Sequence, residues 1–216
     1  MNEKQYYDRV KWIETNLVDY DLLAGRRGKF RPLFPQTDCE FMLLLAEVER
    51  IQPKVIVEIG SRHGGSFLCF TTLLKPELAI ALDLPDGPWG RKHSFKNLTK
   101  VVNEGKRCGV NTIAIDCDTH KPETLKLLKK HLGGRKIDFL FIDGDHTYDG
   151  VKQDFEMYSP LVRDGGIIGF HDVKKKVEVT KCKVDELWNE LTPNFHTKEF
   201  VFSCGIGLLY YKAKEI

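Results

Sequence analysis

From residue 55 onward, short apolar runs alternate along the chain with longer segments of helical periodicity. The apolar runs lie at residues 55–59, 78–82, 111–115, 137–142 and 166–170. Runs of this length that are apolar on both faces are typical of buried parallel strands. The intervening segments predict helices over residues 66–74, 95–104, 122–132, 148–161 and 177–191. This alternation predicts an α/β fold in which helices cover both faces of a mostly parallel sheet.

The last part of the chain breaks this alternation. Two further apolar runs, at residues 200–203 and 206–211, are separated by only Cys204 and Gly205. A connection this short fits a hairpin, whereas a helical crossover between parallel strands needs a dozen or more residues. We therefore expect an antiparallel hairpin to close the sheet.

The first 36 residues are less regular than the rest. They predict a separate helical or lid segment over residues 1–36, with one helix near residues 4–17, and a main domain over residues 37–216. Thr37 or Asp38 can cap the first helix of that domain. Its apolar stripe contains Phe41, Leu44, Leu45 and Val48.

The composition excludes several classes of protein. The chain has 216 residues, 30% of them charged, and a net charge of +2, which fits a globular domain and gives no electrostatic signature of nucleic-acid binding. It shows neither a signal peptide nor an apolar run of membrane-spanning length. The cysteines form no C-x-x-C pair, as expected of reduced thiols. We therefore expect a cytoplasmic protein that does not bind nucleic acid or membrane.

The turn after the first predicted strand has the composition of a cofactor cradle. Its pattern is Glu58-x-Gly60-x-x-x-Gly64, which is neither the dinucleotide fingerprint G-x-G-x-x-G nor a Walker loop. Gly60 permits a backbone conformation and a close ligand approach that a Cβ would block. Gly64, Gly65 and Ser66 begin a helix whose free amides face the same side. The turn therefore predicts a site for a small anionic or zwitterionic cofactor.

Polar residues also follow the next two predicted strands. Asp83 ends the second strand, where ribose-binding carboxylates lie in dinucleotide folds; the alternative is that it caps a helix or begins a turn. The third strand leads into Asp116, Cys117, Asp118 and Thr119.

The fourth and fifth strands end in a group of ionisable residues. Asp143, Asp145 and His146 follow the fourth strand, and His171 and Asp172 end the fifth. Because the carboxyl ends of neighbouring parallel strands share one edge, we expect these side chains to crowd together and to perturb each other's pKa values. The alternative for Asp145 is capping of the following helix.

These motifs resemble those of class I methyltransferases that use S-adenosylmethionine. The pattern E-x-G-x-x-x-G resembles their first motif, and residues 141–148 (FIDGDHTY) with residues 161–173 (LVRDGGIIGFHDV) resemble methyltransferase family 24, the cephalosporin-hydroxylase-like small-molecule O-methyltransferases. The resemblance covers about residues 36–211 and implies a three-layer Rossmann-like fold with a seven-stranded sheet. It also implies methyl transfer to a hydroxyl of a small molecule, a sugar or glycosylated metabolite among the candidates. The cofactor-binding residues that we predict by this resemblance are Glu58, Gly60, Ser61, Gly64, Gly65, Ser66, Asp83, Leu84, Asp118, Thr119 and Asp143. Cys117 departs from the glycine that is usual at its position.

The same resemblance implies a metal site and a base. Metal-dependent members would place ligands at Asp143, His171 and Asp172, but they usually carry a carboxylate where this chain has His171. Imidazole is a poor magnesium ligand and suits manganese, iron or zinc better. Three alternatives follow: the metal is not magnesium, His171 is not a ligand, or no metal binds. The candidate cations are Mg²⁺ and Mn²⁺. We predict His146 as the general base, with Asp143 and Asp145 as further catalytic residues. The alternative is a His146 that merely hydrogen-bonds Asp172 or a backbone carbonyl.

Two other functions stay open at this point. The pairs at 145–146 and 171–172 superficially resemble the ligands of a metal-dependent, phosphoesterase-like hydrolase, although that function leaves Glu58 and Asp83 without a role. A non-catalytic cofactor-binding protein is the third possibility. Residues 20–36 and 84–93 are candidates for contacting the acceptor, and a homo-oligomer is expected.

Overall fold

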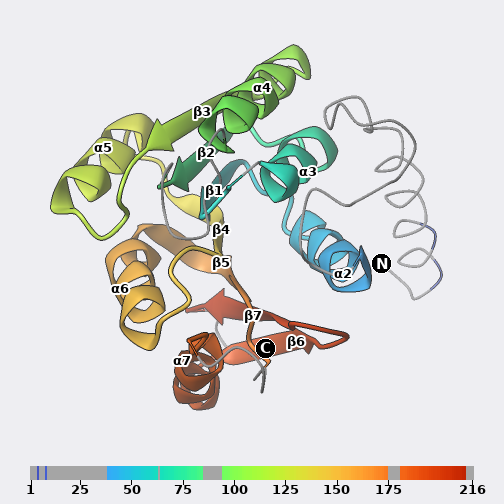
Figure 1. Cartoon of the computed structure of the whole chain (residues 1–216). Helices are drawn as coiled ribbons and strands as arrows, with labels where there is room; N and C mark the ends of the chain where they lie inside the picture. Colours follow the sequence, from blue (N-terminus) through green and yellow to red (C-terminus); the bar gives the residue numbers. More distant parts are fainter. Residues whose placement is uncertain are drawn as a thin grey trace.

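A computed structural model describes residues 38–62, 64–84, 94–174 and 181–212, together with Lys4 and Asp8. Within these residues, seven strands form one sheet in the order β3-β2-β1-β4-β5-β7-β6 (Figure 1). The strands are β1 (Val55–Ile59), β2 (Leu78–Asp83), β3 (Asn111–Asp116), β4 (Ile137–Ile142), β5 (Val162–His171), β6 (His196–Phe200) and β7 (Ile206–Tyr211). The helices are α2 (Asp38–Glu49), α3 (Gly65–Leu73), α4 (Ser94–Arg107), α5 (Pro122–Leu132), α6 (Tyr148–Tyr158) and α7 (Val184–Leu191), with 3₁₀ turns η2 (Ser159–Leu161) and η3 (Thr192–Asn194). The predicted α/β fold with a seven-stranded sheet is confirmed.

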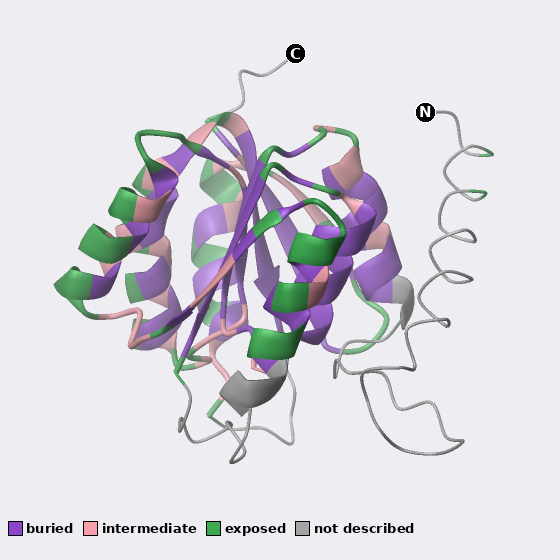
Figure 2. Cartoon of the chain, turned by 90° about the horizontal axis from the view of Figure 1, so that it is seen from above, coloured by how far each residue is buried: buried purple, intermediate pink, exposed green. Residues whose placement is uncertain are grey.

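The helices form two layers on opposite faces of the sheet (Figure 2). On one face α2, α3 and α4 pack against the strands, and the core there is rich in phenylalanine: Phe41, Phe67, Phe70, Phe139 and Phe141 are all fully buried. On the other face α5, α6 and α7 bury Leu128, Leu132, Val151, Tyr158, Leu187 and Trp188. Because both faces are covered, β1 and β2 are buried along their whole length, as their continuous apolar runs predict.

The strands from β3 to β5 run parallel, and β7 runs antiparallel to both β5 and β6. The predicted closing hairpin is therefore confirmed, but the predicted position of its first strand is wrong. We expected residues 200–203, whereas β6 spans His196–Phe200 and residues 201–205 form the turn. The reason is the buried carboxylate of Glu40 in α2, whose Oε1 accepts hydrogen bonds from the backbone amides of Phe202, Ser203 and Gly205. These amides are not available to a neighbouring strand.

The helices agree with the predicted periodicity except at some ends. The predicted stripe of α2 is fully buried, and so, almost completely, is the stripe of α7 that contains Val184, Leu187, Trp188 and Leu191. The helix expected over residues 177–191 begins only at Val184, because residues 181–183 form a turn and a coil. Similarly, α6 ends at Tyr158 and continues as a 3₁₀ turn through Pro160, whose ring is incompatible with an α-helical interior.

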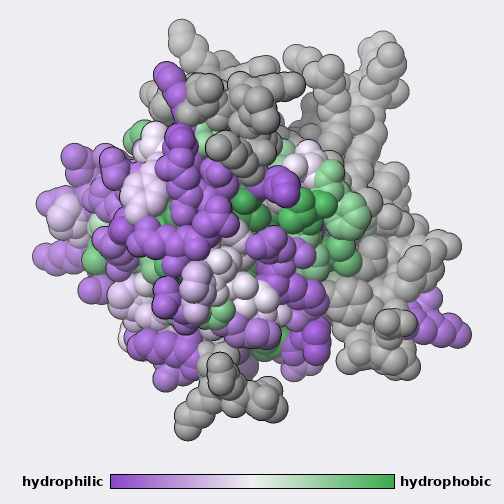
Figure 3. All heavy atoms as spheres, turned by 90° about the horizontal axis from the view of Figure 1, so that it is seen from below, coloured by the Kyte–Doolittle hydropathy of each residue, from purple (hydrophilic) through white to green (hydrophobic). Residues whose placement is uncertain are grey.

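Several predictions lie outside the described residues. They concern the segment 1–36 with its helix at 4–17, apart from Lys4 and Asp8, the loop at 85–93, and the helix start at 177–180. Among the described helices, none combines the length and apolar character needed to cross a bilayer. One face of the molecule is largely hydrophilic, with hydrophobic side chains gathered in one area of it (Figure 3).

Candidate active site

The turn after β1 is held tightly against the end of β4. Gly60 has φ +84°, and a Cβ built on it would stand 2.1 Å from the backbone oxygen of Asp143. The Gly60 amide donates to the carbonyl of Leu82 (2.8 Å), and the Asp143 amide donates to that of Ile59 (2.9 Å). Gly60 is therefore required by the contact between two strand ends, in addition to the left-handed conformation that the motif predicts.

Glu58 places a buried carboxyl group beside this turn. It is fully buried, and its Oε1 accepts a hydrogen bond from the hydroxyl of Ser66 in the first turn of α3. Its Oε2 is buried without a hydrogen-bond partner in the described protein. Burial, together with the charges of Asp143 and Asp83, raises the pKa of Glu58 to about 8. A ligand that donates a hydrogen bond or carries a positive charge would satisfy this oxygen.

Asp83 repeats this arrangement at the end of the neighbouring strand β2. Its Oδ1 accepts a hydrogen bond from the Arg62 amide (3.0 Å), and its Oδ2 is buried without a hydrogen-bond partner in the described protein. Burial and the nearby Asp116 raise its pKa. Leu84, the next residue, is half exposed. Glu58 and Asp83 therefore each keep one buried oxygen for which the described residues supply no donor.

The remaining predicted cofactor residues lie around the same edge of the sheet. Ser61, Gly64, Gly65 and Ser66 are buried, and Gly64 begins α3 in a left-handed conformation. Asp118 accepts a hydrogen bond from the His120 amide (2.9 Å), and the carbonyl of Thr119 accepts one from Tyr158 (2.6 Å). These contacts fix the loop after β3, and the predicted cofactor roles of these residues stay predictions.

Two histidines and two aspartates form a closed network after β4 and β5. The Nε2 of His146 lies 3.1 Å from Oδ1 of Asp143, and its Nδ1 lies 3.2 Å from Oδ2 of Asp172. The Nδ1 of His171 lies 3.1 Å from each of the same two carboxylate oxygens. The predicted crowding of these four side chains is confirmed. The contact between His146 and Asp172 also agrees with the alternative prediction, in which His146 only forms a hydrogen bond with Asp172 and does not act as a base.

The network shifts the pKa values of its members in opposite directions. Burial alone would lower the pKa of His146, but its hydrogen bonds to Asp143 and Cys182 and the two aspartate charges raise it to about 10. Burial likewise opposes protonation of His171, yet the Asp143 charge and the hydrogen bonds to both aspartates raise its pKa well above the usual value. For Asp143, burial is outweighed by the histidines, and its pKa is lowered. The aspartates therefore favour the protonated, positively charged form of both rings.

Asp145 stands apart from this network, so the prediction that it crowds together with the other four side chains is wrong. Its side chain is exposed and accepts a hydrogen bond from the Thr147 amide (2.8 Å), while the Thr147 hydroxyl caps α6 by accepting from Gly150 (3.1 Å). These contacts match the alternative in which Asp145 orders the start of the helix. Its predicted catalytic role stays a prediction.

Two groups of three donor atoms in the described residues are close enough together to hold one metal ion. One consists of His146, Asp172 and Cys182, and the other of His171, Asp172 and Cys204. Both share Asp172 with the predicted ligand set of Asp143, His171 and Asp172. Neither Cys182 nor Cys204 belongs to a motif that predicts a function, so the sequence alone does not identify them as ligands.

The sequence of the chain matches one protein family over this whole region. The profile of methyltransferase family 24, described as a methyltransferase domain, matches residues 57–173, which include all of the strand ends described above. The chain belongs to this family of class I methyltransferases. Family membership favours a methyltransferase over the metal-dependent hydrolase.

Individual relatives extend this picture. A rhamnosyl O-methyltransferase of Mycobacterium tuberculosis is 21% identical over 176 residues, covering 78% of this chain and 61% of the relative. The matches to this and two other curated relatives cover between 18% and 61% of the length of those proteins.

Solved structures share the fold. A Staphylococcus aureus protein described as a putative caffeoyl-CoA O-methyltransferase superposes with a TM-score of 0.63 at 16% identity, covering 92% of this chain and 91% of the other. An O-methyltransferase from Bacillus cereus in complex with SAH gives a TM-score of 0.60 at 15% identity, covering 95% and 91%. These likenesses establish the Rossmann-like methyltransferase fold.

Proposed function

We propose that this protein transfers a methyl group from S-adenosylmethionine to a hydroxyl oxygen of a small molecule, with a sugar as the favoured acceptor. The observation that carries the proposal is the pair of buried, half-satisfied carboxyl groups of Glu58 and Asp83 at the ends of adjacent strands. The cofactor has groups that complement both, namely an ammonium group and ribose hydroxyls. The rhamnosyl O-methyltransferase relative supports a sugar hydroxyl as the acceptor.

The cofactor, when bound, supplies a methyl group on a positively charged sulfur, which is already an activated leaving group. Glu58 would face the methionine moiety of the cofactor, and Asp83 would accept hydrogen bonds from its ribose. Leu84 and Asp118 would flank its adenine ring. The main tasks of the protein are then to align the acceptor oxygen with the methyl carbon and to remove the hydroxyl proton.

His146 is the proposed proton acceptor. It lies between Asp143 and Asp172, and its side chain is 28% exposed, so an acceptor molecule can reach it. A ring that donates to both aspartates holds two protons and has no free lone pair. Catalysis therefore requires His146 to lose one proton, which leaves one nitrogen as the base while the other keeps its aspartate.

A divalent cation at Asp143, His171 and Asp172 is a second part of the proposal. It would polarise the acceptor hydroxyl and lower its pKa. The donor set fits Mn²⁺ better than Mg²⁺, because His171 contributes an imidazole nitrogen. The two carboxylates raise the pKa of His171 and favour its protonated form, so a cation at this site would compete with a proton for the His171 ring. We also propose a cytoplasmic protein and a homo-oligomer.

Titration calorimetry with S-adenosylmethionine and S-adenosylhomocysteine tests the cofactor, and methyl transfer to rhamnose-containing acceptors tests the reaction. Each titration is repeated with EDTA and then with added magnesium or manganese. We expect micromolar binding of the cofactor. Absence of binding under all of these conditions would overturn the proposed function.

A further inference from the structure

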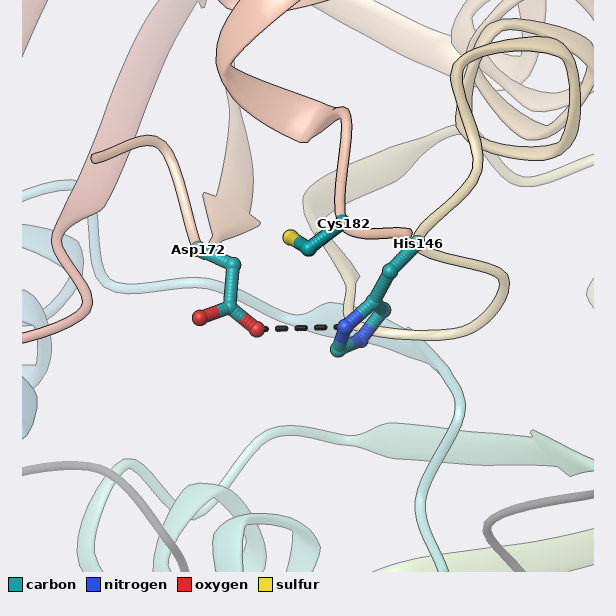
Figure 4. Close-up of side chains that lie close together, drawn as sticks. All are labelled: His146, Asp172 and Cys182. Atoms are coloured by element: carbon teal, nitrogen blue, oxygen red, sulfur yellow. Dashed lines mark ion pairs between the residues drawn. The ribbon is translucent and has the colours of Figure 1, made fainter. Parts of the chain in front are cut away.

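Three side chains with different donor atoms meet beside the carboxyl ends of β4 and β5 (Figure 4). His146, Asp172 and Cys182 each offer one donor atom, and these atoms all lie within 4.8 Å of one another. An imidazole nitrogen and a thiol sulfur together are a donor set that Zn²⁺ accepts and Mg²⁺ does not. We propose that these three side chains form a binding site for Zn²⁺ or another thiophilic divalent cation.

The backbone holds the three donors in place. The amide of Lys183, next to Cys182, donates a hydrogen bond of 2.7 Å to the carbonyl of His146. This bond ties the segment before α7 to the loop after β4. Asp172 has φ +62°, a left-handed backbone conformation that is uncommon for residues other than glycine. The backbone therefore brings the three donor atoms together.

The groups behind the donors are those that support bound metals. A histidine that binds a metal usually donates its other ring N–H to a carboxylate, and the Nε2 of His146 lies 3.1 Å from Asp143. A ligating carboxylate is usually hydrogen-bonded in turn, and Asp172 lies 3.1 Å from the Nδ1 of His171. Both non-sulfur donors thus have a fixed orientation.

The number and charge of the donors also fit a zinc ion. Three protein ligands leave one position of a tetrahedral ion open for water or a small molecule. A thiolate and a carboxylate together balance the two positive charges. Binding would release the thiol proton of Cys182 and the proton on Nδ1 of His146. The group with Cys204 has the same types of donor, but all three of its members are buried, whereas His146 and Cys182 are half-buried and accessible.

Zinc at this site would block the proposed methyl transfer. This consequence rests on the proposed function, whereas the metal site itself does not. With the ion on Nδ1 and a proton on Nε2 donated to Asp143, the ring of His146 has no lone pair left to accept the hydroxyl proton. Zinc binding and base catalysis by His146 therefore exclude one another. Zinc should inhibit methyl transfer.

Cobalt titration of the purified full-length chain tests the site directly. Co²⁺ replaces Zn²⁺ and, when bound by a thiolate, gives a charge-transfer band in the near ultraviolet. We expect this band in the unmodified protein, its disappearance when Zn²⁺ is added, and its loss in Cys182→Ser. Cys117→Ser is the matched control, because Cys117 is equally half-buried but lies at the end of β3; the band should persist in it. In Asp143→Asn, which removes the support behind His146, the cobalt affinity should fall by about 10–100-fold.

A second measurement avoids substitution altogether. Zn²⁺ should slow alkylation of Cys182 in the unmodified protein, as followed by mass spectrometry of its peptides, and should leave alkylation of the exposed Cys108 unchanged. A missing cobalt band, a band that survives in Cys182→Ser, or alkylation of Cys182 at the same rate with and without zinc would each overturn the site.

Failure of the site and failure of the proposed function are distinguishable. Cobalt binding without any binding of S-adenosylmethionine would leave the metal site standing and overturn the function. Methyl transfer without a cobalt band would support the proposed function and overturn the metal site. If the protein both binds cobalt and transfers methyl groups, zinc should lower the rate of methyl transfer in the unmodified protein by a factor at least ten times larger than in Cys182→Ser. Equal inhibition of the two proteins would overturn the inhibitory role.

Discussion

The α-carbon of Gly60 lies so close to the backbone oxygen of Asp143 that a side chain at residue 60 would overlap the end of β4. This contact joins the two strands that carry Glu58 and the histidine–aspartate network. It therefore links the proposed cofactor site to the proposed base through the backbone, without an intervening side chain.

Gly60→Ala should be strongly destabilising. Gly109 supplies a matched control, since it has the same φ of +84° but nothing within 4 Å of an added Cβ. Gly109→Ala should cost only the conformational strain, about 1 kcal/mol. Gly60→Ala adds the overlap with Asp143 and should cost at least about 2 kcal/mol more. Urea denaturation of both variants measures the difference; equal midpoints would contradict the contact.

Glu58→Gln should change the pH dependence of stability. The pKa of Glu58 in the folded protein is raised to about 8 from a usual 4.5, so its contribution is fully present below pH 4.5 and is lost as the pH rises through 8. Glutamine does not titrate. The stability of Glu58→Gln relative to the unmodified apo protein should therefore increase between pH 5 and 9, by about 4 kcal/mol, and its relative melting temperature should rise accordingly. Calorimetric melting of both proteins, with the exposed Glu156→Gln as control, measures this; parallel curves would contradict a buried Glu58.

Much of this fold could be predicted because its signals are local. Strands β1, β2 and β4 are buried along all or nearly all of their length, so their apolar runs predict their positions directly. The edge strand β6 has the sequence His-Thr-Lys-Glu-Phe and is only partly buried. It contains no apolar run from which a strand could be predicted. The neighbouring apolar residues Val201 and Phe202 are instead in an exposed turn, because Glu40, far away in the sequence, binds the turn amides.

The candidate site divides in the same way. Glu58, Asp83, Asp143, His146, His171 and Asp172 follow predicted strands directly, so the parallel topology alone brings them to one edge. Cys182 follows no strand, and its position depends on the hydrogen bond between Lys183 and His146. Which carboxylate oxygens are satisfied and which are not depends on single side-chain orientations. No sequence pattern encodes those.

Asp83→Asn should weaken binding of S-adenosylmethionine. The charged Oδ2 that would accept from the ribose becomes an amide, which cannot accept a hydrogen bond there, and the loss of a charge-assisted bond should raise the Kd by about tenfold or more. Calorimetric titration measures the Kd, with Asp164→Asn as an exposed control that should bind normally. An unchanged Kd would place the ribose elsewhere.

His146→Ala should abolish most of the methyl transfer while leaving cofactor binding intact. Removal of a general base typically lowers kcat by about 10²–10⁴-fold. The variant should bind S-adenosylmethionine with a Kd within about twofold of the unmodified protein, because Glu58 and Asp83 are untouched. His131→Ala, in the last turn of α5, is the control. A near-normal kcat in His146→Ala would mean that His146 only positions Asp143 and Asp172.

The pH profile of kcat/KM should report the protonation of His146. A base must be unprotonated to act, and the two aspartates raise the pKa of His146 to about 10, so kcat/KM should rise with pH well beyond 6.5 and level off only near 10. Asp172→Asn removes one of the charges that stabilise the imidazolium form, and the midpoint of the rise should therefore shift to lower pH by about one unit or more. Steady-state rates between pH 6 and 10.5 measure both midpoints, and Asp164→Asn should leave the midpoint in place. A profile that is flat in the unmodified protein would argue against His146 as the base. An unshifted midpoint in Asp172→Asn would instead show that Asp172 does not control the charge of this ring.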